Sequence, residues 1–143
     1  MQIDHIHMYK LIPDIGLMVL IWLVQLIIYP SFRYYNPNNL KSWHRPYTSR
    51  ITVVVLPLML SQIVISIILL LISNWSSYYI IDSLLVVLTW VLTFVIFVPL
   101  HQNIDKNQEA SASVSQLIKY NWLRTILWSL IALLSIYKTL IIN

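Results

Sequence analysis

Polar side chains recur at helical spacing inside segments of this chain that are otherwise apolar. Gln25, Tyr29 and Arg33 follow one another at intervals of four residues, which places them on one face of a helix. His44 and His101 each stand at one end of an apolar segment. A polar group in an apolar environment costs free energy unless it finds a partner, so these residues indicate a shared buried site.

The two histidines are the candidate acid–base residues, because imidazole exchanges protons near neutral pH. A proline two residues before His101 is expected to kink its helix and aim the ring into the bundle, with His44 opposite. We expect Arg50 and Arg124 to stabilise negative charge on a substrate oxygen and Tyr47 to donate a hydrogen bond. We expect no carboxylate to orient His44, which excludes a serine–histidine–aspartate triad.

A larger set of polar and aromatic side chains lies on the inward faces of the apolar segments. These candidate ligand-binding residues are Gln25, Tyr29, Arg33, Tyr47, Arg50, Gln62, Asn121, Arg124 and Trp128. Arginine binds carboxylate and phosphate groups well, so the set predicts a site for a lipophilic or anionic small molecule, such as a quinone, a phenol or a lipid. The alternative is that these side chains only bond to one another and to the backbone and hold the helices together.

Three prolines favour a cavity beside these residues. Pro30, Pro57 and Pro99 each lack an N–H donor and leave the carbonyl four residues earlier without its helical partner. Within a membrane such carbonyls need a neighbouring side chain, a water molecule or a ligand.

The composition shows which kind of element must position these residues. Of 143 residues, 59% are hydrophobic and only 10% are charged, against about 25% in an ordinary soluble domain. The mean hydropathy of +0.75 agrees with this, and together these values exclude a water-soluble globular fold and a disordered chain. The absence of cysteine excludes disulfides and thiol catalysis, and a single glycine, Gly16, excludes glycine-rich phosphate loops.

Four apolar segments are long enough to cross a bilayer as helices, which takes about 20 residues. They cover residues of about 15–32, 51–72, 79–100 and 122–142. We therefore predict an all-α membrane protein with a single transmembrane domain over residues 1–143, an up-down-up-down bundle of four transmembrane helices. The first segment has no preceding basic cluster and no cleavage site, so we expect it to stay in the mature protein.

Basic residues predict the orientation, because cytoplasmic loops of membrane proteins are enriched in lysine and arginine. Seven of the nine basic residues fall on one face, and these are Arg33, Lys41, Arg45, Arg50, Lys106, Lys119 and Arg124. We predict a bacterial inner-membrane protein with both long loops in the cytoplasm and both termini outside. The net charge of +4 then reflects topology and anionic lipid rather than nucleic-acid binding. At the opposite boundary, near Asp14 and Asp82, we expect no comparable polar cluster.

Both long loops contain helix-start patterns. Asn36-Pro37 is typical of a capped start, and Leu40, Trp43 and Tyr47 after it are expected to share one face of a short interfacial helix. In the second loop we expect a helical lead-in to the fourth span, capped near Asn107.

For cofactors, the absence of glutamate from the spans excludes a carboxylate-bridged di-iron site. Haem bound axially by His44 and His101 stays open as a hypothesis, while no cofactor and no metal site is the expectation. Asp4, His5 and His7 are expected to form a solvated N-terminal tail rather than a metal site.

Two further functions stay open from the sequence. Four short-looped helices suit lateral packing, which is typical of an accessory or structural subunit of a larger membrane complex, or of a homo-oligomer. The other alternative is a membrane oxidoreductase or oxygenase-like enzyme in which His101 is the acid–base group, with His44 as its partner.

The chain also resembles a family of small, uncharacterised four-helix bacterial integral membrane proteins, loosely similar to the anthrone-oxygenase-like group. The motifs that carry the resemblance are Trp22-x2-Gln25-x3-Tyr29-Pro30-x-Phe32, Trp43-His44-x2-Tyr47-x2-Arg50-Ile51, Pro57-x-Met59, Val98-Pro99-Leu100-His101 and Asn121-Trp122-x-Arg124-Thr125-x2-Trp128. The resemblance implies the four-helix fold and cofactor-free oxygenation of a phenolic substrate. The chain departs from the family at Tyr47, where a histidine is common, and at Gln62, where a glutamate is common. These departures weaken a metal or proton-transfer role that uses those two positions.

Overall fold

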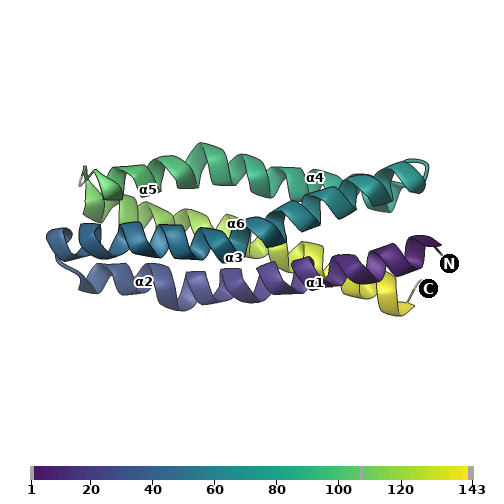
Figure 1. Ribbon diagram of the computed structural model, residues 1–143, viewed down its shortest axis with the longest axis horizontal. Helices are drawn as coiled ribbons and strands as arrows, with labels where there is room; N and C mark the ends of the chain where they lie inside the picture. Colours follow the sequence, from purple (N-terminus) through teal and green to yellow (C-terminus); the bar gives the residue numbers. More distant parts are fainter. Residues whose placement is uncertain (1, 107, 142–143) are drawn as a thin grey trace.

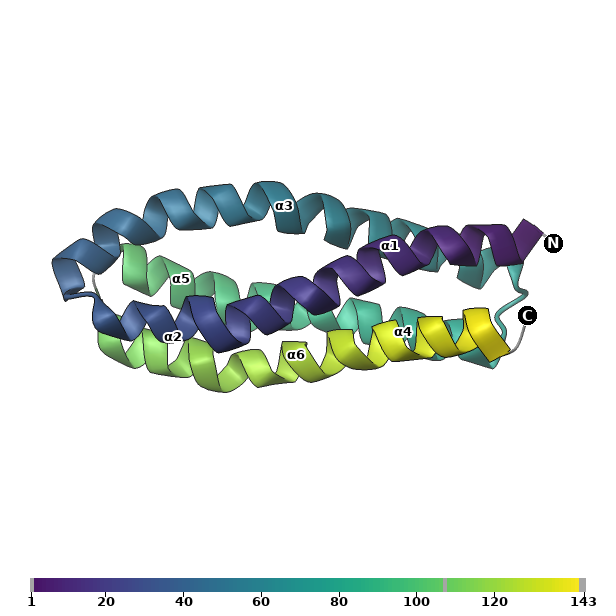
Figure 2. The same ribbon diagram turned by 90° about the horizontal axis from the view of Figure 1, so that it is seen from below.

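The structure, a computed structural model, describes residues 2–106 and 108–141 and consists of long antiparallel helices (Figures 1 and 2). Four helical stretches in these residues are long and apolar enough to cross a membrane, and they cover His5–Tyr34, Pro37–Ile72, Ser77–Asp105 and Ala110–Leu140. The predicted all-α, four-helix membrane architecture is therefore confirmed.

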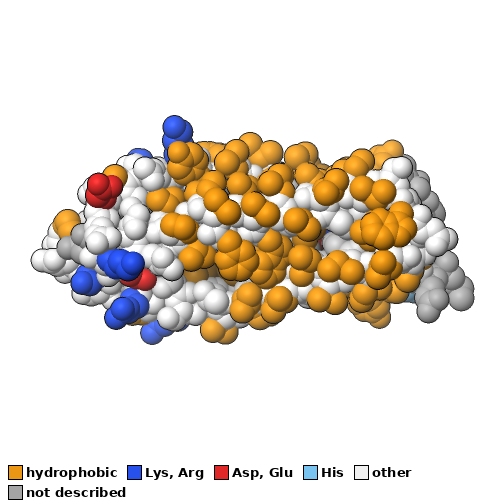
Figure 3. All heavy atoms as spheres, turned by 90° about the horizontal axis from the view of Figure 1, so that it is seen from above, with side chains coloured by type: hydrophobic (Ala, Val, Ile, Leu, Met, Phe, Trp, Pro, Cys, Tyr) orange, Lys and Arg blue, Asp and Glu red, His pale blue; other side chains and the backbone are white. Residues whose placement is uncertain are grey.

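The two ends of the bundle differ in what they carry. Both chain ends and the turn at residues 73–76 lie at one end, which we call the terminal end (Figure 1). The link at residues 35–36, together with residues 106 and 108–109 of the second link, lies at the other, which we call the connection end. Figure 3 shows a broad apolar band along the bundle, with lysine and arginine side chains gathered at the connection end.

The first and third membrane helices each contain a π-helical segment. The first consists of α1 (Gln2–Leu23), η1 (Val24–Ile28), α2 (Tyr29–Ser31) and η2 (Phe32–Tyr34), of which η1 is π-helical and η2 is a 3-10 turn. The third consists of α4 (Ser77–Leu92), the π-helical η3 (Thr93–Phe97) and α5 (Val98–Asp105).

Both π-helical segments end two residues before a proline, Pro30 in the first helix and Pro99 in the third. A proline ring crowds the carbonyl four residues earlier, and a wider π turn relieves that contact. The N–H of Tyr29 accordingly bonds the carbonyl of Val24, five residues back. Prolines thus reshape these two helices, whereas Pro57 lies within an unbroken helix.

The second and fourth membrane helices are continuous. Helix α3 (Pro37–Ile72) starts as predicted, since the Asn36 side chain accepts a hydrogen bond from the backbone N–H of Asn39 and Pro37 is the first helical residue. The expected interfacial helix is therefore the first part of α3 and not a separate element. Helix α6 covers Ala110–Ile141, and the predicted cap at Asn107 lies outside the described residues.

The core lies along the axis of the bundle and is apolar only in part. Leu17, Ile21, Val86, Leu117 and Ile131 are among its fully buried hydrophobic residues. Between them lie buried polar side chains from all four membrane helices, which form two clusters at different depths. Because lipid cannot hydrogen-bond these groups, they must satisfy one another.

Candidate functional site

The two histidines singled out in the sequence are hydrogen-bonded to each other. His44 of α3 and His101 of α5 approach to 2.8 Å between Nε2 and Nδ1, with their rings stacked at 4.9 Å between centroids. The other side of His44 lies 2.7 Å from a carboxylate oxygen of Asp105. The expectation that no carboxylate orients His44 is therefore wrong. Asp105 follows His101 by four residues, so the two side chains share a helix face, a spacing that the sequence already contained.

The chain of hydrogen bonds continues from His101 to Tyr29 and Arg124. The Tyr29 hydroxyl oxygen lies 3.0 Å from His101 Nε2 and 3.1 Å from Arg124 Nη2. Arg124 itself is held by two hydrogen bonds to the Asn121 amide oxygen, at 2.7 and 3.1 Å. Asn121 in turn donates to the side-chain oxygen of Gln25 at 2.9 Å.

The charged groups at the two ends of this hydrogen-bond chain, the Arg124 guanidinium and the Asp105 carboxylate, determine which atom donates in each hydrogen bond. A guanidinium can only donate and a carboxylate can only accept. Arg124 therefore donates to Tyr29. With Asp105 ionised and both imidazoles neutral, His44 Nδ1–H donates to Asp105, His101 Nδ1–H donates to His44 Nε2, and the Tyr29 hydroxyl donates to His101 Nε2. All donors point from the guanidinium to the carboxylate, so one concerted shift can move a proton along the chain.

Burial makes this chain a path between the interior and the connection end. His44 is fully buried and Tyr29 is 2% exposed, whereas 27% of the Asp105 side chain is exposed. Asp105 is also the last residue of α5, next to the 106–109 link. A proton that leaves Tyr29 through the two imidazoles therefore arrives at a partly exposed carboxylate.

A groove of about 340 Å³ opens between α3 and the α4–η3–α5 helix and reaches these residues. Its walls are mainly apolar and include Ile51, Val55, Met59, Trp90, Phe94 and Phe97. Toward the connection end it is lined by His101, Asp105 and Arg124. The Arg124 guanidinium carbon lies only 3.5 Å from the centre of the Phe97 ring, which holds the charge in place by a cation–π contact.

Other candidate residues are not part of this hydrogen-bond chain. Arg33 and Arg50 are exposed, and no described hydrogen bond joins either residue to Tyr29, His101, His44 or Asp105. Tyr47 is buried and packs its ring against Phe32 and His44, at 5.3 and 6.1 Å between centroids.

A second polar cluster lies nearer the terminal end, contrary to the expectation that this boundary carries none. The ammonium of Lys10 is 2.7 Å from a carboxylate oxygen of Asp14 and 2.8 Å from one of Asp82, and all three side chains are buried. Ser135 donates to Asp14, and Ser66 donates to Asp82 at 3.0 Å. The four-residue spacing of Lys10 and Asp14 is the sequence pattern that indicates this ion pair.

Gln62 and Trp128 belong to this second cluster and not to the histidine chain. Gln62 donates to Asp14 at 2.7 Å and accepts from the Trp128 indole N–H at 3.2 Å. The Trp128 ring lies 5.7 Å from the Arg124 guanidinium carbon, so it separates the two clusters and contacts both.

The geometry bears on the cofactor hypotheses. Metal–imidazole bonds are about 2.0 Å long, so nitrogens 2.8 Å apart leave no room for an iron between His44 and His101 in this arrangement. Among the described residues no group of three or more His, Asp or Glu side chains is placed to hold a metal ion. His7 is not in a solvated tail, because α1 begins at Gln2 and the His7 ring is buried.

Comparison with protein-family models, with curated proteins and with solved structures finds no match. The structure itself defines the class: a polytopic four-helix membrane protein with a buried network of His, Arg, Tyr and Asp side chains. The family resemblance of the sequence motifs stays a prediction.

Proposed function

We propose that the protein binds a lipophilic small molecule with a polar or anionic head in the groove between α3 and the α4–η3–α5 helix. The observation that carries the proposal is the make-up of this groove, whose apolar walls lead to Arg124 and His101. Its volume of about 340 Å³ falls at the lower end of the usual range for small-molecule sites, about 300–1,000 Å³.

The direction of the groove suits an amphiphile that enters from the bilayer. Met59 and Trp90 line it nearer the middle of their helices, whereas Thr48 and Gln102 line it near the connection end. An apolar tail then packs toward the middle of the membrane, and the head meets the Arg124 guanidinium. A guanidinium binds carboxylate, phosphate or a quinone oxygen through charge-assisted hydrogen bonds.

A groove-filling variant tests this proposal with a matched control. Val55 lines the groove, whereas its neighbour Val54 is 52% exposed and absent from the lining. Val55→Phe is expected to abolish the binding of a short-chain benzoquinone, an alkylphenol or a lysophosphatidic acid, measured by native mass spectrometry and by quenching of tryptophan fluorescence. Val54→Phe is expected to bind as the unchanged protein does.

Two results would contradict a ligand site in this groove. If none of the three probes binds and no lipophilic compound co-purifies with the protein, the polar side chains serve only to hold the helices together. Equal binding by the Val55→Phe and Val54→Phe proteins would place any ligand elsewhere.

The directed chain from Tyr29 to Asp105 favours a second candidate function, acid–base catalysis on the bound molecule. His101 lines the groove, and a substrate hydroxyl that replaces Tyr29 at its Nε2 can give up a proton there. The His101 Nδ1 proton then passes to His44 Nε2, and the His44 Nδ1 proton passes to Asp105. Oxygenation of a phenol, which the sequence resemblance implies, requires such a deprotonation. A nitrophenol with an alkyl tail tests this, since its anion and its neutral form absorb at different wavelengths. Bound probe is expected to be anionic in the unchanged protein and neutral in His101→Leu.

A further inference from the structure

The cluster at the terminal end contains one more acid than base. Lys10, Asp14 and Asp82 are 0–1% exposed and lie within the candidate membrane spans. Among the described residues, no second lysine or arginine forms an ion pair with either carboxylate. With all three groups ionised the cluster would hold a net charge of −1 away from water.

A buried net charge is unfavourable, because neither apolar side chains nor lipid replace the hydration it has lost. The remaining partners of the carboxylates are the neutral side chains of Gln62, Ser66 and Ser135. We propose that this cluster is a proton-binding site, in which Asp82 carries a proton and Lys10 and Asp14 stay ionised.

The hydrogen bonds indicate which carboxylate takes the proton. Asp14 accepts from three donors: Lys10 and Ser135 at one oxygen and Gln62 at the other. Asp82 accepts from Lys10 at Oδ1, and the hydrogen bond described at its Oδ2 comes from the Ser66 hydroxyl, at 3.0 Å. A hydroxyl can accept as well as donate, so a proton on Asp82 Oδ2 finds an acceptor in Ser66. No group bound to Asp14 offers that exchange, since Lys10 and the Gln62 amide nitrogen only donate and Ser135 shares the Lys10-bound oxygen.

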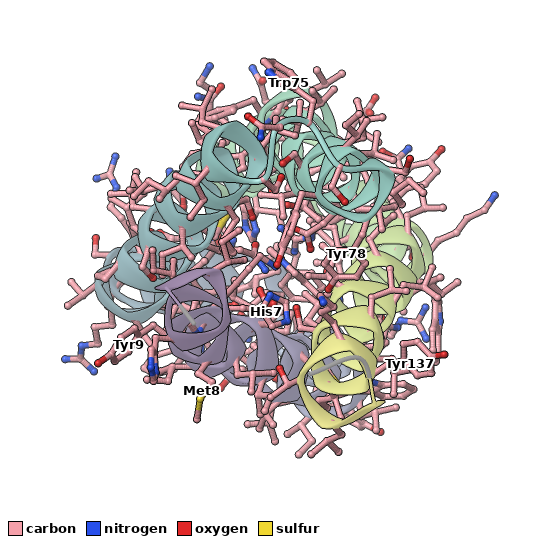
Figure 4. All side chains as sticks on the ribbon, turned by 90° about the vertical axis from the view of Figure 1, so that its right-hand side faces the viewer. His7, Met8, Tyr9, Trp75, Tyr78 and Tyr137 are labelled. Carbon is pink, nitrogen blue, oxygen red and sulfur yellow. The ribbon has the colours of Figure 1, made fainter. Side chains whose placement is uncertain are left out.

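An independent observation places a proton-exchanging group beside the cluster. The His7 ring is 1% exposed, and its Nε2 lies 3.1 Å from the backbone carbonyl of Ser135. A carbonyl only accepts, so Nε2 carries the hydrogen and Nδ1 is a buried acceptor that has no partner among the described residues. Figure 4 shows His7 directed into the bundle at the terminal end, and His7 lies one helical turn closer to the chain start than Lys10.

The other titratable groups that face this site come from the neighbouring helix. The rings of Tyr78 and Tyr79 on α4 contact the His7 ring edge-on, at 5.8 and 6.0 Å between centroids. The groups contributed by α3 and α6, Gln62, Ser66 and Ser135, do not titrate. His7 is therefore the imidazole among the described residues that lies against this cluster, through its hydrogen bond to the backbone of Ser135.

Infrared spectroscopy of the full-length protein in lipid nanodiscs tests the site, because the chain has only five Asp and Glu residues. The unchanged protein at neutral pH is expected to show the carbonyl stretch of a protonated carboxylic acid, shifted in D₂O. Asp82→Asn is expected to lack the band, and Asp105→Asn, at the opposite end, to keep it. Ser66→Ala is expected to shift the frequency of the band, since it removes the acceptor of the acid proton. This second variant tests the site even if Asp82→Asn does not fold.

Three results would overturn the proposal. One is the absence of the band from the unchanged protein at neutral pH. Another is a carbonyl-stretch band that persists in Asp82→Asn, or a band whose frequency is unchanged in Ser66→Ala. The third is a bound sodium or potassium ion in native mass spectra that Asp82→Asn loses, since a metal cation would then balance the charge.

Discussion

Tyr29 and His101 are 72 residues apart in the chain and are joined by a hydrogen bond of 3.0 Å. Each follows a π-helical segment, Tyr29 directly after η1 and His101 four residues after η3. Each is also close to a proline, since Pro30 directly follows Tyr29 and Pro99 lies two residues before His101. The turn that accommodates each proline thus also sets the direction of the side chain that enters the hydrogen-bond chain.

The first prediction concerns His101 and Arg124, which line the groove and belong to the hydrogen-bond chain. His101→Ala and Arg124→Ala are expected to lower the affinity for an anionic amphiphile, Arg124→Ala by about tenfold to a hundredfold, because a charge-assisted hydrogen bond contributes about 1.5–3 kcal/mol. Isothermal titration with lysophosphatidic acid in detergent measures this.

The control for both variants is Trp75→Phe, in the turn at the terminal end, where Trp75 is 61% exposed. All three proteins must insert and elute as one species for the comparison to hold. Unchanged affinity in both inner variants would remove them from the binding site, and unfolding of both would favour a purely structural role.

The second prediction concerns the tautomers of the histidines. Nitrogen-15 NMR of histidine-labelled protein is expected to show the Nδ1–H form for His44 and His101 and the Nε2–H form for His7. Asp105→Leu removes the acceptor that fixes the order and is expected to mix the two forms at His44. His5, which is exposed, serves as an internal reference. An Nε2–H signal from His101 in the unchanged protein would contradict the directed chain.

The third prediction concerns the ion pairs of Lys10. Lys10→Met leaves two buried carboxyl groups without their cation and is expected to destabilise the protein by about 3–5 kcal/mol. Lys119→Met, at an exposed position, is expected to change stability little. Unfolding by SDS in mixed micelles measures both. The double variant Lys10→Met, Asp14→Asn is expected to recover part of the loss, because it removes the carboxylate that Lys10→Met leaves unpaired. Equal stability of the Lys10→Met and Lys119→Met proteins would refute the role assigned to Lys10.

The fourth prediction concerns orientation, which rests on the distribution of basic residues. Alkaline phosphatase joined after Asn143 is expected to be active in the periplasm, and a cytoplasmic reporter fused there to be inactive. The opposite pattern would put both links of the connection end outside the cell.

The fold was predictable because hydropathy alone decides that four helices cross a membrane. The site was predictable in part, since His44, His101, Tyr29 and Arg124 stood out as polar groups in apolar surroundings. Asp105 and Lys10 were not predicted as site residues because both lie outside the predicted apolar segments of about 79–100 and 15–32. The helices extend past those segments, so that α5 ends at Asp105 and α1 carries Lys10 within it.

The hydrogen-bond partners of the buried residues were harder to predict from the sequence than the residues themselves. Whether Gln62 meets Arg124 or Asp14 depends on how each helix is rotated about its axis. The sequence shows the prolines that cause the π-helical segments, but it does not show how far each widened turn rotates the residues after it. Gln62 was therefore assigned to the histidine site, although its hydrogen bonds go to Asp14 and Trp128.

A one-residue deletion has a different effect in the π-helical segments of this chain than in its α-helical segments. One residue adds only about 1.5 Å to a helix but about 100° to its rotation. A π turn holds one residue more than the α turn that it replaces. Loss of one residue from Val24–Ile28 would therefore close this segment to a regular α-helix and leave Tyr29 directed at His101, whereas the same loss from the α-helical part of the span would rotate Tyr29 away. A one-residue gap at the π-helical segment of a related chain would thus mark a protein that keeps the same side chains in its interior.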